Sequence, residues 1–374
     1  MKCKVSQAEF AKALRACEKS LLLKANLPVL SNVLVSVGKN SLEVLATNLE
    51  TATKAIIPSQ TQQEGKTTLP GRVLLEFVSQ LPEGVVSIEK LGGEVLVSAK
   101  NYSARLATMA AEEFPAIPKI ETGREFKIEA QAFAKCALQI VFCAAQDEGR
   151  PILNGVLCEG VKSRLSMVAT DGYRLGFVEV PTQSQEKAIK IVVPAKSVGE
   201  MAKLIGENLG GQEEKILKMI VADNLNQVNF KVGSIEFTSR LIEGEFPDWQ
   251  KIIPTSFTTK AKITREEFIR KIKIASIFAR DSGSIVRLKL EGKKLTVLAN
   301  TSQVGSNETE TEVEIKGKGG EIAFNYRYLL EALSAIDSED VNFEMSESLT
   351  PGRLTPAEGQ ESFFHIIMPV RLQS

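Results

Sequence analysis

The chain has 374 residues, 43% of them hydrophobic and 25% charged, which is an ordinary composition for a globular protein of two or three domains. Its 46 basic residues are balanced by 46 acidic ones, so any grip on nucleic acid depends on where the charges lie, not on bulk charge. The single histidine excludes a multi-histidine metal site, and we expect neither metal nor cofactor. The five scattered cysteines, the absence of a signal peptide and the lack of any long apolar run favour a cytoplasmic protein that does not enter a membrane.

In chain order, the same set of predicted elements occurs three times. Each repeat opens with a β-like stretch and a helix anchored on a phenylalanine, which is Phe10, Phe133 or Phe268. A strand then ends in a related motif: Leu45-Ala-Thr-Asn48, Val168-Ala-Thr-Asp171 or Leu298-Ala-Asn-Thr301. A further strand runs into a second helix, near Pro70, Pro194 and Asn325. The repetition predicts three copies of one domain, at residues 1–121, 122–255 and 256–374.

The strands within each repeat are short, alternate in hydrophobicity and are separated by tight turns. Adjacent strands joined in this way predict antiparallel sheets, with two helices packed on them in each domain, an α+β fold.

The first helix of each repeat has an apolar face and an opposite face that is rich in lysine or arginine. In the second repeat the opposite face carries Lys135, Gln139 and Gln146. For any one helix, a solvated surface is the simpler interpretation. Because the pattern recurs, the faces could line one positive surface of a neutral protein and bind phosphates without reading bases. The candidate residues for this surface are Lys12, Arg15, Lys135, Lys196, Lys203, Arg270 and Lys273.

Signals of catalysis are weak. The chain contains no Walker-type phosphate loop, no G-x-S-x-G elbow and no H-E-x-x-H motif. Asp171 follows a strand as a catalytic aspartate can, but no second acid or base is recognisably paired with it. A hydrolase using Asp171 is kept as the alternative function, and a monomeric binding scaffold without DNA as a third.

Several local motifs, in order, carry a resemblance to the bacterial DNA polymerase III beta subunit, the sliding clamp. They are Ala169-Thr-Asp-Gly-Tyr-Arg-Leu175, Gly244-Glu-Phe-Pro-Asp248, Phe324-Asn-Tyr-Arg-Tyr328 and Met368-Pro-Val-Arg-Leu372. The resemblance implies a non-catalytic head-to-tail homodimer that closes as a ring around duplex DNA, without sequence preference, and tethers a polymerase. The implied partners are the DNA polymerase III alpha subunit, the clamp loader, and other polymerases and repair proteins that dock through short linear peptides.

The resemblance also implies a peptide pocket between the second and third domains. Its apolar walls would be Leu153, Leu175, Pro247, Ile252, Leu349, Met368, Pro369 and Val370. Its polar edge would be Thr170, Gly172, Tyr173, Arg174, Lys251, Asn325, Tyr328 and Arg371. Such a mix suits peptide capture, since apolar anchors supply affinity and polar groups fix register. The simpler alternative is that these residues only pack two domains together.

The resemblance further implies a ring interface at Ile277 and Phe278, facing a strand near Leu106, and DNA contacts at Lys24 and Gln146. The chain departs from the family pattern at a few positions, where Lys251, Tyr173, Val370 and Ala104 replace an arginine, a histidine, a methionine and a large aromatic residue. We expect these changes to retune which peptides bind and how the interface packs.

Overall fold

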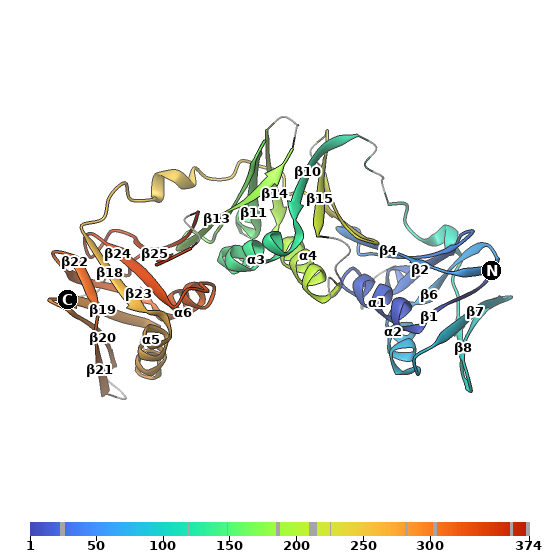
Figure 1. Ribbon diagram of the computed structural model, residues 1–374, viewed down its shortest axis with the longest axis horizontal. Helices are drawn as coiled ribbons and strands as arrows, with labels where there is room; N and C mark the ends of the chain where they lie inside the picture. Colours follow the sequence, from blue (N-terminus) through green and yellow to red (C-terminus); the bar gives the residue numbers. More distant parts are fainter. Residues whose placement is uncertain are drawn as a thin grey trace. The chain divides into compact units, whose positions relative to one another are not determined.

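The computed structural model describes residues 1–22, 27–117, 120, 122–147, 149–184, 188–208, 215–224, 226–280, 283–301, 305–359 and 362–371 (Figure 1). The chain forms two compact units. The first unit consists of residues 1–134, 182–187 and 199–241, and the second of residues 135–181, 188–198 and 242–374. Each is described by itself below.

The first third of the chain contains two α-helices and two short 3₁₀ helices among its strands. Its elements are β1 (Lys2–Ser6), α1 (Gln7–Glu18), η1 (Pro28–Ser31), β2 (Asn32–Val37), β3 (Ser41–Thr47), β4 (Thr51–Pro58), β5 (Gln60–Gln63), β6 (Gly65–Pro70), α2 (Gly71–Gln80), β7 (Val85–Leu91), β8 (Glu94–Ala99), β9 (Tyr102–Ala107) and η2 (Ala111–Glu113).

The second third repeats this plan with small changes. Its elements are β10 (Gly123–Glu129), α3 (Ala130–Ile140), η3 (Val141–Cys143), η4 (Pro151–Asn154), β11 (Gly155–Val161), β12 (Arg164–Thr170), β13 (Arg174–Gln183), β14 (Ile189–Pro194), α4 (Ala195–Asn208), β15 (Ile216–Ala222), β16 (Gln227–Val232), β17 (Ile235–Arg240) and η5 (Trp249–Ile252).

The last third again has two α-helices among its strands. Its elements are β18 (Thr259–Thr264), α5 (Arg265–Ala279), β19 (Ile285–Glu291), β20 (Lys294–Thr301), β21 (Gly305–Glu312), β22 (Glu314–Gly317), β23 (Gly320–Asn325), α6 (Tyr326–Ser334), β24 (Asp340–Met345), β25 (Gly352–Pro356) and β26 (Phe363–Ile367). The predicted α+β fold, with helices on antiparallel sheets in each third, is confirmed.

In the first unit, one sheet has the order β5-β1-β7-β8-β9. A second sheet runs β6-β2-β3-β4-β17-β16-β15-β10, and every one of these pairs is antiparallel. The β4–β17 pair joins a strand of the first repeat to a strand of the second, so one continuous sheet crosses their junction. Helices α1 and α2 pack together on one face of this sheet (Figure 1).

The second unit is built on the same principle. Its long sheet runs β14-β11-β12-β13-β26-β25-β24-β18-β22, and here β13–β26 joins the second repeat to the third. A four-stranded sheet has the order β21-β20-β19-β23. Helices α5 and α6 pack against each other, α5 on strands β19 and β20 and α6 on β23 (Figure 1).

The anchoring phenylalanines form the centre of the cores, as the repeat predicts. Phe10, Phe133 and Phe268 are all at most 1% exposed. The polar face predicted for the first helix of the second repeat is wrong in one part, because Gln139 is buried. Gln146, predicted on the same face, lies beyond the helix, because α3 ends at Ile140 and a 3₁₀ turn follows.

Candidate peptide-binding and DNA-facing surfaces

The turn between β12 and β13 is held rigid by its own side chains. Asp171 Oδ1 accepts the backbone N–H groups of Tyr173 (2.8 Å) and Arg174 (3.0 Å). Thr170 Oγ1 donates to the Arg174 carbonyl at 2.6 Å and accepts the Gly172 N–H at 3.1 Å. Gly172 takes a φ of +91°, a conformation that favours glycine. The turn therefore presents Tyr173, which is 60% exposed, and directs Arg174 inward.

Arg174 connects the second repeat to the third within the second unit. Its guanidinium bonds Asp171 Oδ2 at 3.1 Å and the Phe142 carbonyl at 2.7 Å, and pairs with the carboxylate of Glu331 on α6. The Tyr328 ring lies beneath it, 4.5 Å from the guanidinium carbon to the ring centroid. Because the side chain is only 12% exposed, these bonds hold the turn firmly against α6.

The C-terminal segment lies on both sides of this contact. The Met368 N–H donates to the Tyr173 carbonyl at 2.8 Å, and the Val370 N–H donates to the Ala323 carbonyl at 2.8 Å. A groove of about 390 Å³ is lined by Leu349, Val370 and Arg371, together with Ser348 and the start of β23. Leu349 is 53% exposed at its rim. Three of the expected pocket residues thus meet in one groove.

The remaining expected pocket residues divide into a buried layer and an exposed rim. Leu153 and Leu175 are buried in a cluster with Val168, Phe246 and Ile366. At the rim, Pro247, Ile252 and Lys251 are exposed, and Lys251 Nζ pairs with Asp248 Oδ2 at 2.9 Å. Pro369 is half-buried, and Asn325 caps α6 by accepting the Arg327 N–H at 3.0 Å.

Several residues of this site were missed by sequence reasoning. Glu331 and the Phe142 carbonyl are principal partners of Arg174, and Trp249 stacks on Phe177 with 5.2 Å between ring centroids. No local pattern marks Glu331 or Phe142, because each is defined by a neighbour that is distant along the chain. Trp249 has one local signal, since it is an aromatic residue just after the Glu-Phe-Pro motif.

The only histidine of the sequence, His365 on β26, lies near Arg174 and packs against Phe142 with 5.5 Å between ring centroids. It is 1% exposed, and its Nδ1 lies 3.6 Å from Cys143 Sγ. Burial, followed by the nearby positive charge of Arg174, lowers the pKa of His365 to about 3. The ring is therefore neutral at physiological pH.

Both carboxylate oxygens of Asp171 accept hydrogen bonds that stabilise the turn. Its two carboxylate oxygens accept from two backbone N–H groups and from the Arg174 side chain, and it is 15% exposed. Among the residues that the structure describes, no three His, Cys, Asp or Glu side chains gather as a metal site. Within the same residues, no helix has the length and apolarity needed to cross a membrane.

Most of the basic candidates lie on exposed surface. The set comprises Lys12, Arg15, Lys135, Lys196, Lys203, Arg270 and Lys273, and the expected contact Gln146 is exposed too. Lys135 Nζ is paired with Asp337 Oδ2 at 2.7 Å. Lys24 lies outside the described residues.

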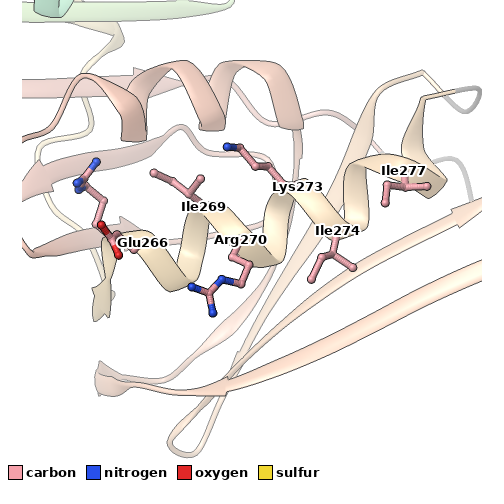
Figure 2. A pocket seen from close by; sticks show the side chains of 7 residues that line it. Glu266, Ile269, Arg270, Lys273, Ile274 and Ile277 are labelled. Carbon is pink, nitrogen blue, oxygen red and sulfur yellow. The ribbon is translucent and has the colours of Figure 1, made fainter.

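Helix α5 brings basic and apolar candidates together. A hollow of about 470 Å³ along this helix is lined by Arg270 and Lys273 and by three isoleucines, Ile269, Ile274 and Ile277 (Figure 2). Ile277 is 55% exposed, and Phe278 is half-buried. Leu106 on β9, the expected partner region, is only 8% exposed, so that strand offers a neighbour mainly its backbone and the side chains beside Leu106.

The chain matches known proteins along its whole length. Three models of the DNA polymerase III beta subunit match in succession: the N-terminal domain at residues 1–118, the central domain at 127–248 and the C-terminal domain at 250–371. The chain belongs to this bacterial family. It contains three clamp domains and is a sliding clamp, a processivity subunit rather than an enzyme, and the hydrolase alternative is not supported.

Individual clamps agree in sequence and in structure. The beta sliding clamp of Synechocystis is 28% identical over 395 residues, covering 100% of both chains. The solved beta subunit of Thermotoga maritima superposes with a TM-score of 0.92 at 26% identity, covering 100% of both chains. The clamp of Pseudomonas aeruginosa, solved bound to griselimycin, gives 0.93 at 27% identity, again covering 100% of both.

Proposed function

We propose that two copies of this chain close head to tail into a ring around duplex DNA. The observation that carries this is the recurrence of exposed basic side chains on a helix of every clamp domain, in a chain with no net charge. Such a surface neutralises phosphates without reading sequence, so direct binding is weak and sensitive to salt. Retention then comes from enclosure, which lets the clamp slide while it tethers a polymerase.

Two strands support a head-to-tail interface. Strand β9 ends one sheet and β21 ends another, so each has backbone groups available to a further strand. Strand β21 carries Glu308, Glu310 and Glu312, all exposed, while β9 carries the exposed Arg105. We assign these two edges, with Ile277 and Phe278 beside β21, to the contact between copies. Ala104 on β9 then leaves room that a larger side chain would fill.

We assign the groove around Leu349, Val370 and Arg371, with the Tyr173 turn, to short linear peptides of partner proteins. Apolar rim residues would receive the anchoring side chains and the polar edge would fix their register. The partners are the DNA polymerase III alpha subunit, the clamp loader, and other polymerases and repair proteins. The working compartment is the cytoplasm, where bacterial DNA is copied.

Loading the clamp onto nicked circular DNA tests the enclosure. The purified protein, loaded by a clamp loader, is expected to stay on the circle through gel filtration and to be lost when a restriction enzyme linearises it. Equal retention on circular and linear DNA would contradict the ring.

Deleting residues 368–374 tests the peptide site separately. The truncated clamp is expected to keep its dimer in analytical ultracentrifugation and to lose affinity for a peptide of the Gln-Leu-x-Leu-Phe type. An unchanged affinity for this peptide would show that the groove is not the peptide site.

A further inference from the structure

A second hollow lies at the junction of the first and second clamp domains, inside the first unit. It has a volume of about 790 Å³. Its floor is the outer face of the continuous sheet, from β2 and β3 through β4 and β17 to β15, and Phe114, Ile117 and Ile120 form one wall.

This hollow is the internal counterpart of the junction that carries the proposed peptide site. Strand β4 pairs with β17 as β13 pairs with β26, with Ala52 opposite Thr238 in the first case and Leu175 opposite Ile366 in the second. The Arg240 N–H donates to the Glu50 carbonyl at 3.0 Å, as the Met368 N–H does to Tyr173. The two junctions therefore share backbone geometry and can be compared position by position.

At the second junction, large side chains fill the corresponding space. Phe177 stacks on Phe364 with 4.8 Å between ring centroids and on Trp249, and Leu175 and Ile366 are buried beside them. At the first junction the positions of Phe177 and Phe364 are occupied by Lys54 and Glu236. The positions of Leu175 and Ile366 hold Ala52 and Thr238, and the loss of bulk leaves the space open.

The hollow has the character of a binding site. Its size falls within the range of about 300–1,000 Å³ that ligand pockets have. Leu34, Leu45 and Ile220 give it an apolar floor, and Asn229 and Thr238 add polar groups that can fix an orientation. The wall on the side of β3 and β6 carries Glu43 and the pair Lys66–Glu112 (3.4 Å), so that side has one net negative charge.

The opposite side of the hollow, along β4, β17 and β16, is positively charged. One rung of the sheet places Lys54, Glu236, Lys231, Lys218 and Lys127 side by side on adjacent strands. Glu236 accepts from Lys54 at 2.6 Å and from Lys231 at 3.1 Å. Burial by itself raises the pKa of Glu236, but these two ammonium groups outweigh it and leave the pKa below its usual value. The rung has four cations around one carboxylate, Glu236, and Glu125 lies 3.7 Å from Lys127 at its end.

We propose that this hollow is a second peptide site, which takes an extended partner segment with two apolar side chains next to an acidic residue. The apolar side chains enter between the floor and the Phe114–Ile117 wall, and the acidic residue lies over Lys231 and Lys218. The proposal goes beyond the proposed function, which gives peptides only to the groove at the second junction.

The test uses one probe, acetyl-Gln-Leu-Asp-Leu-Phe-amide, in isothermal titration calorimetry with the full-length clamp. The intact protein is expected to bind two peptides per chain. The double variant Ala52→Leu/Thr238→Ile, which introduces the residues of the other junction, is expected to bind one. The truncation of residues 368–374 is also expected to bind one, and the combination none.

A charge reversal checks the acidic contact without filling the hollow. Lys231→Glu is expected to weaken the first-junction site by about tenfold, and to do so less at high salt. Lys289→Glu is the matched control, because Lys289 is equally exposed (48% against 47%) and also pairs with a glutamate, but lies on β19. It is expected to leave both sites unchanged.

The outcomes separate the two proposals. One site that disappears on truncation and is untouched by Ala52→Leu/Thr238→Ile and Lys231→Glu overturns the second site and leaves the groove assignment standing. Peptide binding that remains after deletion of residues 368–374 and disappears in Ala52→Leu/Thr238→Ile supports the second site, whether or not the groove also binds peptide. If the filled variant does not fold, an unchanged affinity in Lys231→Glu overturns the inference.

Discussion

The two junctions between clamp domains have the same backbone and different contents. Each is a continuous sheet that crosses from one domain to the next, by β4–β17 in one case and β13–β26 in the other. The second is closed by stacked aromatic rings and by the contacts of Arg174 with Asp171, Phe142 and Glu331, which we call the arginine clip. The first is open above the pair Lys54–Glu236. The two junctions therefore share one strand register, while a few outward-facing side chains decide whether the space above the sheet is filled, as at the second junction, or open, as at the first.

The turns at the two junctions show the same division. Asp171 and Asn48 occupy matching positions, and each accepts backbone N–H groups two and three residues ahead. Gly172 and Leu49 both have positive φ, +91° and +75°. Two residues further along, the chain has Arg174 at one junction and Thr51 at the other. The backbone is again equivalent, and only the arginine side chain forms the contacts with Asp171, Phe142 and Glu331.

Removing the clip is expected to have the largest effect. Arg174→Ala leaves Asp171 and the Phe142 carbonyl without their partner in a mostly buried place, and should lower the free energy of unfolding by about 3 kcal/mol. The matched change Thr51→Ala, which removes hydroxyl bonds to Asn48 and Ser20, should cost about 1 kcal/mol. Urea unfolding followed by circular dichroism measures both. An equal decrease in the free energy of unfolding in the two variants would mean that the contacts of Arg174 contribute no more than an ordinary hydroxyl hydrogen bond.

Acid is expected to loosen the second junction selectively. His365 has a pKa of about 3 in the folded protein and an ordinary value near 6.5 when unfolded, so the unfolded state binds more protons between these values. Stability is therefore complete above the ordinary pKa and falls as the pH drops, by about 2 kcal/mol from pH 7 to pH 5. The matching position of the first junction is Phe237, which does not titrate.

Hydrogen exchange at pH 5 and pH 7 measures this difference, with faster opening expected at β13–β26 and no comparable change at β4–β17. His365→Phe, which copies the first junction, should flatten the dependence over that range. A pH dependence that persists in this variant would assign it to other groups.

Filling the first junction is expected to have the smallest effect. Ala52→Leu places apolar bulk in the open hollow and should raise the free energy of unfolding by about 1 kcal/mol. The opposite change at the second junction, Leu175→Ala, should lower it by about 3 kcal/mol because Leu175 is fully buried. Thermal melts compare the two variants. A destabilised Ala52→Leu protein would show that the hollow cannot accept a larger side chain.

Much of the fold could be predicted from the sequence. The phenylalanine anchors, the three repeats and the alternating strands follow from hydrophobic periodicity, which is local and survives in each copy. The turn at Asp171 could also be predicted, because Asp-Gly after a strand is a local signal. The basic helix faces came from the same kind of argument.

The contacts that make the site could not be predicted in this way. Glu331 reaches Arg174 across 157 residues, and Cys143 reaches His365 across 222. The hollow at the first junction depends on Ala52 facing Thr238 and Lys54 facing Glu236 across two strands, and hydrophobic periodicity does not show which strands pair. Gln146 was placed on this helix for a related reason, since the end of α3 at Ile140 depends on how the following segment packs.

The central claim is that two copies of this clamp enclose a hole that holds DNA. Negative-stain electron microscopy of the purified protein tests it most directly. We expect closed rings with six similar lobes, from three domains in each of two chains. Isolated particles with three lobes, persisting at micromolar concentration, would contradict the account.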